Sequence, residues 1–273
     1  IANPAPLAGS TGIQPSRGWL KNTPSRFGYG LPSTTCESQT NSQPEEPEAP
    51  FAMKTLINHR IKVIGLMTAL FLVLFVLHIA HLYWLKNTGE YLQFFDFNSE
   101  ENLPTAFATF NLFFAGCLLF YISTHKTPQE MKWRWFILAV IFFFLAFDEY
   151  AMVHDPLSRK LRPYVSDVDL LHFAWVIPYS ILLLVFTLAY LRFFFALPRK
   201  YMILFGASGF IFVLGAVGFE LIGAPRTKNF GRSDIYYTVF TTVEECLEFI
   251  GIILFNYALL TYLKEKVTLL KRS

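Results

Sequence analysis

Charged residues are scarce in this chain. Only 16% of its 273 residues are Asp, Glu, Lys or Arg, whereas 53% are hydrophobic and 30 are phenylalanine. A soluble domain carries about 25% charged residues, so the composition argues against one. The formal net charge of +3 is too small to indicate a nucleic-acid partner, and we expect none. Several apolar runs of membrane-spanning length indicate a multi-span membrane protein.

Cysteine is scarce as well. The three cysteines, Cys36, Cys117 and Cys246, show no metal-binding or redox spacing. Cys117 and Cys246 lie within apolar runs, where a small buried thiol is the ordinary interpretation. Cysteine chemistry is therefore not part of the predicted function.

Residues 1–52 lack the regular spacing of apolar residues that predicts a helix or a strand. Eight of the fifteen prolines fall here, and no signal-peptide hydrophobic region is present. We expect this segment to be disordered, because it has too few apolar residues to offset the chain entropy lost on folding. Met53 resembles a natural start, so we interpret residues 1–52 as a leader or a non-native extension. Residues 53–273 form the predicted transmembrane domain.

Six apolar segments follow, each long enough to cross about 30 Å of hydrocarbon. They cover residues 61–85, 104–124, 133–154, 170–195, 201–223 and 237–262. The predicted fold is an all-α polytopic bundle of six transmembrane helices. Of the basic residues that flank the segments, thirteen lie on one side and seven on the other, which places both termini in the cytoplasm. Close helix packing is predicted for span five by Gly206, Gly209, Gly215 and Gly218.

Ionisable residues are absent from the inner half of every predicted span except at its ends. In the outer half they are frequent, and they occur at the ends of spans three and five and at the starts of spans four and six. The residues in this layer are Asp148, Glu149, His154, His172, Glu220, Glu244, Glu245 and Glu248. Ionisable groups at membrane depth are costly unless they are paired, protonated or facing water, so this layer marks a functional site.

Carboxylates beside imidazoles favour a divalent metal ion, because one cation neutralises several buried anions. We therefore predict metal ligands among Asp148, Glu149, His154, His172, Glu220, Glu244, Glu245 and Glu248, and catalytic roles for Asp148, Glu149, His154, Glu220 and Glu248. The identity of the metal stays open. The Glu-x-x-His repeats of di-iron bundles are missing, so a di-iron oxidase is not indicated. Without a metal, crowded carboxylates would share protons, as in a proton or cation relay.

Several of these polar residues also have a structural interpretation. Asp155 precedes Pro156 and suits the N-cap of a short interfacial helix. Glu244 and Glu245 suit a capping box in which the acids complement the helix dipole. The remaining alternatives are ion pairs of Asp148, Glu149 and Glu220 with Arg226, Lys228 or Arg232, interfacial packing of His78 and His81, and an interhelical hydrogen bond of Asn111.

The segment Phe147–Asp155 resembles an Asp-Glu-x4-His-Glu segment in a family of uncharacterised bacterial six-span membrane proteins. The likeness extends to residues 215–221 and to the Glu-Glu-x-x-Glu segment within residues 244–251, and it covers the chain from about residue 61 to its end. Asp155 stands where the family has Glu, which weakens a ligand role for Asp155. The family has no established activity. The resemblance implies the six-span fold, this choice of site residues and a bacterial inner (plasma) membrane location.

Three functions remain open at this point. The first is a membrane-embedded, metal-dependent enzyme acting on a lipid-like substrate, with Arg226, Lys228 and Arg232 holding an anionic headgroup. The second is a proton- or cation-coupled transporter, which needs acids reachable from both sides; no internal inverted repeat is apparent. The third is a non-catalytic subunit of a membrane complex, in which the polar layer is a structural network. Membrane lipid is the one predicted partner.

Overall fold

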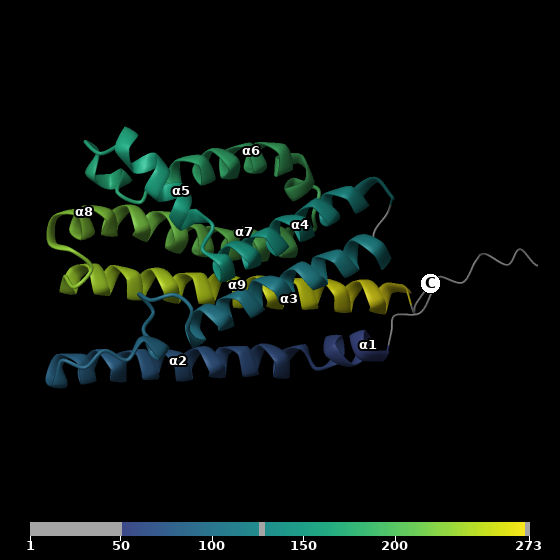
Figure 1. The fold of residues 1–273 in the computed structure, drawn as a ribbon. Coiled ribbons are helices and arrows are strands. Elements are labelled where there is room, and N and C mark those ends of the chain that lie inside the picture. Colours follow the sequence, from purple (N-terminus) through teal and green to yellow (C-terminus); the bar gives the residue numbers. More distant parts are fainter. Residues whose placement is uncertain (1–50, 126–128, 271–273) are drawn as a thin grey trace, which may run out of the picture. The chain divides into compact units, whose positions relative to one another are not determined.

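A computed structural model describes residues 51–125 and 129–270, and within these residues every regular element is a helix (Figure 1). These helices belong to one compact unit, Pro47–Ser273. Five helical segments are long and apolar enough to cross a membrane, and a bent pair makes a sixth when it counts as one broken span. The predicted all-α membrane fold is confirmed. The expected leader, residues 1–52, lies outside the described residues except for Phe51 and Ala52, which begin the first helix.

The observed helices follow the apolar segments of the sequence. They are α1 (Phe51–Asn58), α2 (Arg60–Thr88), α3 (Leu103–His125), α4 (Gln129–Ala151), α5 (His154–Leu161), α6 (Val176–Phe195), α7 (Arg199–Val213), α8 (Glu220–Phe230) and α9 (Ile235–Leu270). A π-helical segment, η4 (Leu214–Phe219), joins α7 to α8. Short 3-10 turns lie in the connections: η1 (Gln93–Phe95), η2 (Arg162–Tyr164) and η3 (Asp169–Leu171).

Helix α9 is the centre of this unit. It packs against α2 and α3 on one side and against α7 and α8 on the other (Figure 1). In its most apolar stretch 61% of the residues are buried, compared with 11% in α6. Leu118, Trp135 and Leu259 belong to the buried apolar core that α3, α4 and α9 share. Because lipid offers no hydrogen-bond partners, each span satisfies its backbone N–H and C=O groups within its own helix. The low burial of α6 means that most of its apolar side chains face outward.

Span three is broken where the sequence predicts one helix over 133–154. Helix α4 ends at Ala151, and α5 leaves it at a bend of 75°. Met152 has a φ of 52°, a left-handed conformation that an α-helix cannot continue through. The Asp148 carboxylate accepts a hydrogen bond from the backbone N–H of His154 at 2.9 Å. It thereby satisfies a donor that the start of α5 leaves without a helical partner.

Asp155 is therefore not the predicted N-cap. That position is occupied by Val153, which makes no side-chain capping bond. Asp155 lies in the first turn of α5 and pairs with Arg159 at 3.0 Å, one turn along the helix. The prediction failed because the carboxylate of α4, not a residue of α5, closes the turn.

Span four begins at Val176, six residues after its predicted start at 170. The backbone carbonyl of His172 accepts a hydrogen bond from Arg162 Nε at 3.0 Å. The amide of Val176 bonds instead to Phe173, three residues back. His172 consequently lies in the connection before α6 and not in the span.

Glycines set the distance between α9 and the segment formed by α7 and η4. A Cβ atom on Gly215 would meet the backbone oxygen of Glu244 at 2.8 Å, and one on Gly251 would meet the backbone nitrogen of Phe212 at 2.7 Å. A larger residue at either position would therefore force the helices apart. The predicted close packing of span five is correct at Gly215, whereas Gly209 faces open space.

Candidate functional site

Five glutamates from three helices come together at one end of this unit. Glu149 lies on α4, Glu220 begins α8, and Glu244, Glu245 and Glu248 lie on α9. Glu248 interacts electrostatically with Glu149 and Glu220. Glu245 interacts with the same two residues and with Glu248, and Glu244 interacts with all four others. We call these five residues the carboxylate cluster; all of them are partly buried.

Local structure explains how the cluster forms. Glu244 and Glu248 are four residues apart on α9 and so share a helix face. Gly215 packs against the backbone of Glu244, and a Cβ there would reach Cγ of Glu248 at 3.0 Å. The π-helical segment η4 contains Gly215 and directly precedes Glu220, and it alters the direction in which Glu220 leaves the helix. The close packing of Gly215 on α9 and the altered helical phase after η4 together place Glu220 near α9.

His154 lies at the border of the cluster, between two carboxylates. Its Nδ1 is 3.4 Å from Asp148 Oδ1, and its Nε2 is 3.6 Å from Glu100 Oε1. Asp148 is only 7% exposed. Glu100 also interacts electrostatically with Glu149 and Glu245, so it extends the acidic region toward the surface.

Trp175 connects this histidine to the cluster. Its indole N–H donates a hydrogen bond to Glu220 Oε1 at 2.9 Å. Its ring lies 5.4 Å from the ring of His154, measured between centroids. The indole therefore fixes one Glu220 oxygen and packs against the imidazole at the same time.

His172, which the sequence groups with these residues, lies among cations instead. Burial lowers the pKa of His172, and the nearby charges of Arg162, Lys228 and Arg232 lower that pKa further. Lys228 bonds to Asp169 at 2.6 Å and holds the pKa of that carboxyl below its usual value. The structure therefore does not bring His172 together with the carboxylate cluster.

The three basic residues of span five and its loop are engaged differently from the predicted ion pairs. Arg226 pairs with Asp234 at 3.1 Å. Lys228 pairs with Asp169. In the part of the chain that the structure describes, Arg232 makes no ion pair, but it acts electrostatically on Glu220 from a longer distance.

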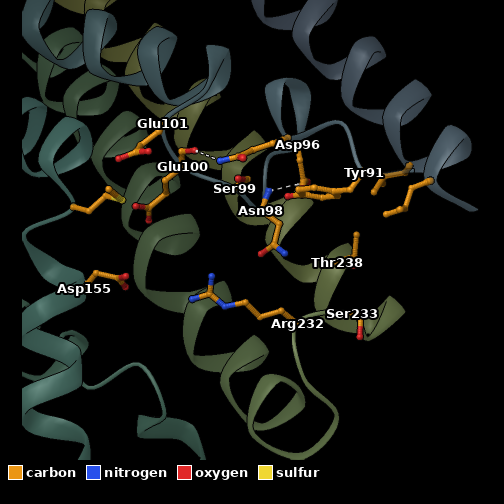
Figure 2. A pocket seen from close by; sticks show the side chains of 14 residues that line it. Tyr91, Asp96, Asn98, Ser99, Glu100, Glu101, Asp155, Arg232, Ser233 and Thr238 are labelled. Atoms are coloured by element: carbon orange, nitrogen blue, oxygen red, sulfur yellow. Dashed lines mark hydrogen bonds between the residues drawn. The ribbon is translucent and has the colours of Figure 1, made fainter. Parts of the chain in front are cut away.

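Figure 2 shows a pocket near the cluster that Glu100 helps to line. Its volume is about 620 Å³. Its walls come from the end of α2, the connection between α2 and α3, the α4–α5 bend and the turn between α8 and α9. Arg232 points into the pocket, and Glu100, Glu101 and Asp155 lie around it (Figure 2). Glu100 is shared between the pocket and His154, so the pocket adjoins the cluster.

A second polar group, which the sequence reasoning underestimated, is centred on Asp96. This residue is 4% exposed and accepts a hydrogen bond from the Tyr91 hydroxyl at 2.7 Å. His78 Nδ1 accepts the backbone N–H of Phe97 at 3.1 Å and lies 3.6 Å from Asp96. The second nitrogen of His78 lies 3.0 Å from the Thr242 hydroxyl. His78 is therefore a fully buried, hydrogen-bonded residue, and the expected packing at the membrane interface is wrong for it.

Sequence reasoning also missed Glu100 and Trp175. The available signal was the group of acids, Asp96, Glu100 and Glu101, in the connection before span two. Nothing in the sequence places that connection against the α4–α5 bend. Trp175 reads as one more interfacial aromatic residue until its bond to Glu220 is seen.

The donor set of the cluster suits a hard divalent cation, because carboxylate oxygens are the preferred ligands of Mg²⁺, Ca²⁺ and Mn²⁺. Over residues 51–125 and 129–270, however, no three His, Cys, Asp or Glu side chains converge at metal-binding distance. A cation would therefore require the glutamate side chains to change rotamer.

The chain was compared with protein families, curated proteins and solved structures. Neither a curated protein nor a solved structure matches the chain. One family model matches residues 63–263, which contain the whole carboxylate cluster, Asp148 and His154. This agrees with the resemblance to a family without an established activity, while the bacterial origin stays a prediction. The matching family is described as a domain of unknown function (DUF8692), and the chain belongs to it.

Proposed function

We propose that this integral membrane domain binds a divalent cation in the carboxylate cluster and uses it on a lipid-like substrate at the adjoining pocket. One observation carries the proposal: five partly buried glutamates from three helices interact with one another. The nearby Arg226 and Lys228 pair with other acids. Arg232 and His154 act on Glu220 without forming an ion pair with it, and two such charges do not balance five carboxylates. An excess of negative charge is unfavourable at membrane depth, and a divalent cation removes that penalty.

The residues take distinct roles in this proposal. Glu149, Glu220, Glu244, Glu245 and Glu248 supply oxygen ligands. Asp148 orients His154 through the α4–α5 bend, and His154 is placed to move a proton at the edge of the cluster. Trp175 holds one oxygen of Glu220 in place. A divalent cation bound there would polarise water or a phosphoryl oxygen. The inner (plasma) membrane of a bacterium is the proposed location.

Metal binding tests the proposal directly. The purified full chain is stripped with a chelator, and its thermal unfolding is followed during titration with Mg²⁺, Ca²⁺, Mn²⁺ or Zn²⁺. At a free cation concentration a hundredfold above Kd, binding stabilises the folded state by about 2.7 kcal/mol. We expect this stabilisation in the wild type and its loss in a Glu245→Gln, Glu248→Gln double variant, together with a fall in metal content by elemental analysis.

Glu90→Gln is the matched control, because Glu90 is an exposed acid in the connection after α2. It should respond to metal as the wild type does. A wild-type protein that none of the four metals stabilises would contradict the proposal. A double variant that unfolds without metal yet binds no less metal than the wild type would favour the structural network of a non-catalytic subunit.

Proton- or cation-coupled transport is the second candidate, and one observation favours it. Asn111 and Asn256 are fully buried below the cluster, and the Asn256 amide donates to the Asn111 backbone oxygen at 3.1 Å. The side-chain oxygens of both residues have no hydrogen-bond partner. Such acceptors accommodate water and extend the polar region deeper than the ionisable residues alone. Proton flux into liposomes that contain the purified protein would separate this function from the enzyme.

A further inference from the structure

We propose that the pocket beside the carboxylate cluster binds a phospholipid headgroup that carries both a phosphate and an ammonium group. This names the substrate class of the proposed function and takes from it only the position beside the cluster. The volume of about 620 Å³ is in the range of small-molecule sites. The charges that line the pocket, its backbone and its depth in the membrane each contribute to the inference.

Arg232 supplies the phosphate-binding end. Its guanidinium points into the pocket (Figure 2). Arg226 and Lys228, the neighbouring cations, are held by Asp234 and Asp169, whereas Arg232 makes no ion pair in the part of the chain that the structure describes. A guanidinium without a carboxylate in contact presents several N–H groups in a plane, which matches the oxygens of a phosphate.

Glu100 and Glu101 supply the opposite end. Oε2 of Glu100 is buried and has no hydrogen-bond partner. Glu101 is exposed at the pocket and forms no ion pair within residues 51–125 and 129–270. An ammonium group has three donors and would satisfy both carboxylates. A purely anionic headgroup would face these acids unfavourably, and a purely cationic ligand would face Arg232, so a zwitterion fits both ends.

The backbone of the pocket is strained in two places. Among the described residues, the only residues other than glycine with positive φ are Glu101, at 58°, and Met152, at 52°. Both line this pocket, although they come from separate connections. Such conformations persist where the surroundings enforce them, and they are concentrated at ligand sites.

The depth of the pocket selects a lipid over a soluble zwitterion. Leu82 and Leu85, in the last turns of α2, form part of the wall. Tyr83 and Trp84 between them are exposed, as is Tyr150 at the end of α4. Exposed Tyr and Trp at the ends of spans mark the level of the lipid headgroups. A headgroup therefore reaches the pocket without leaving the membrane surface.

Binding of short-chain lipids to the purified full chain, in detergent with a chelator present, tests this inference. The probes are short-chain phosphatidylethanolamine, short-chain phosphatidylglycerol, which lacks the ammonium, and soluble phosphoethanolamine, which lacks the tails. We expect the wild type to bind the ethanolamine lipid at least about tenfold more tightly than the glycerol lipid. Arg232→Gln should weaken both lipids about tenfold, and Glu101→Gln should weaken only the ethanolamine lipid.

Lys160→Gln and Glu90→Gln are the controls, because both residues are exposed and neither lines the pocket. They should bind as the wild type does, and unfolding midpoints check that every variant is folded. Equal wild-type affinity for the two lipids, or unchanged ethanolamine-lipid binding in Arg232→Gln, would overturn the inference. Phosphoethanolamine binding as tight as the lipid would overturn the assignment to a lipid, because the ligand would then be a soluble zwitterion. The chelator excludes metal, so failure of the cation site leaves this result unaffected.

Discussion

Residues of the same type, and even adjacent residues, have different roles in this protein. Asp148 and Glu149 are adjacent, yet Asp148 closes the α4–α5 bend while Glu149 interacts electrostatically with the carboxylates of α9. Adjacent residues on a helix point about 100° apart, so one run of acids serves two purposes. His154 and His172 differ in the same way, since one lies between carboxylates and the other among cations.

His172 should make the stability of the protein depend on pH. Because burial and the adjacent cations lower the pKa of His172 below its usual 6.5, the folded protein takes up this proton less readily than the unfolded chain does. The stability that neutral His172 contributes is complete above pH 6.5 and is lost as the pH falls below that value. We expect the unfolding midpoint to drop between about pH 7.5 and about pH 5.5, and to drop less in His172→Gln.

The comparison uses exposed His59 as its control. His59→Gln should keep the wild-type pH dependence, because His59 is exposed in the turn between α1 and α2. If His172→Gln and the wild type lose the same stability over this range, the cations around His172 do not act on its protonation in the way described.

At the scale of helices, the spacing between η4 and α9 determines whether the cluster exists. We expect Gly215→Ala to destabilise the protein by about 1–3 kcal/mol, since the new methyl group would meet the backbone of Glu244 at 2.8 Å and a backbone atom cannot rotate away. The same change should weaken the binding of any cation that Glu220 and Glu248 coordinate together. Thermal unfolding of the purified protein measures the first effect, and metal titration measures the second.

Gly209→Ala is the matched control on the same continuous span. An added Cβ there has no atom within 4 Å, so the substitution should be neutral or stabilise the protein by about 0.5–1 kcal/mol through helix propensity. Equal destabilisation by the two substitutions would mean that glycine flexibility, and not close approach to α9, explains Gly215.

The spans were predictable because membrane helices follow apolar length, and the observed helices overlap each predicted segment. The break at Met152 was not, since methionine carries no turn signal and the turn is held by the Asp148 carboxylate and by the bond from the Asp155 amide to the Met152 carbonyl. The acids of α4, α8 and α9 could be grouped from topology alone. Arg232 was grouped with Arg226 and Lys228 as a headgroup ligand, but the sequence could not show that these two pair with other acids. Glu100 could not be placed at all, because the course of a connection depends on tertiary contacts that no periodicity encodes.

For the whole molecule, the charge bias of the loops makes one further prediction. It places the end of the bundle that carries the cluster, the pocket and Arg232 away from the cytoplasm. Tyr164, at the end of η2, is 85% exposed at that end, and Trp133, near the start of α4, is 68% exposed at the other. In a background with the three cysteines replaced by serine, Tyr164→Cys and Trp133→Cys therefore form a matched pair.

A membrane-impermeant maleimide applied to intact cells should label Tyr164→Cys at once and Trp133→Cys only after the membrane is permeabilised. The reverse pattern would place the pocket on the cytoplasmic side, where the headgroups of the inner leaflet would be its lipids. Labelling of both positions in intact cells would reveal a leaky preparation, which a cytosolic cysteine protein detects. The orientation decides which leaflet supplies the headgroup, because the pocket opens at one end of the described helices and its walls come from the connections at that end.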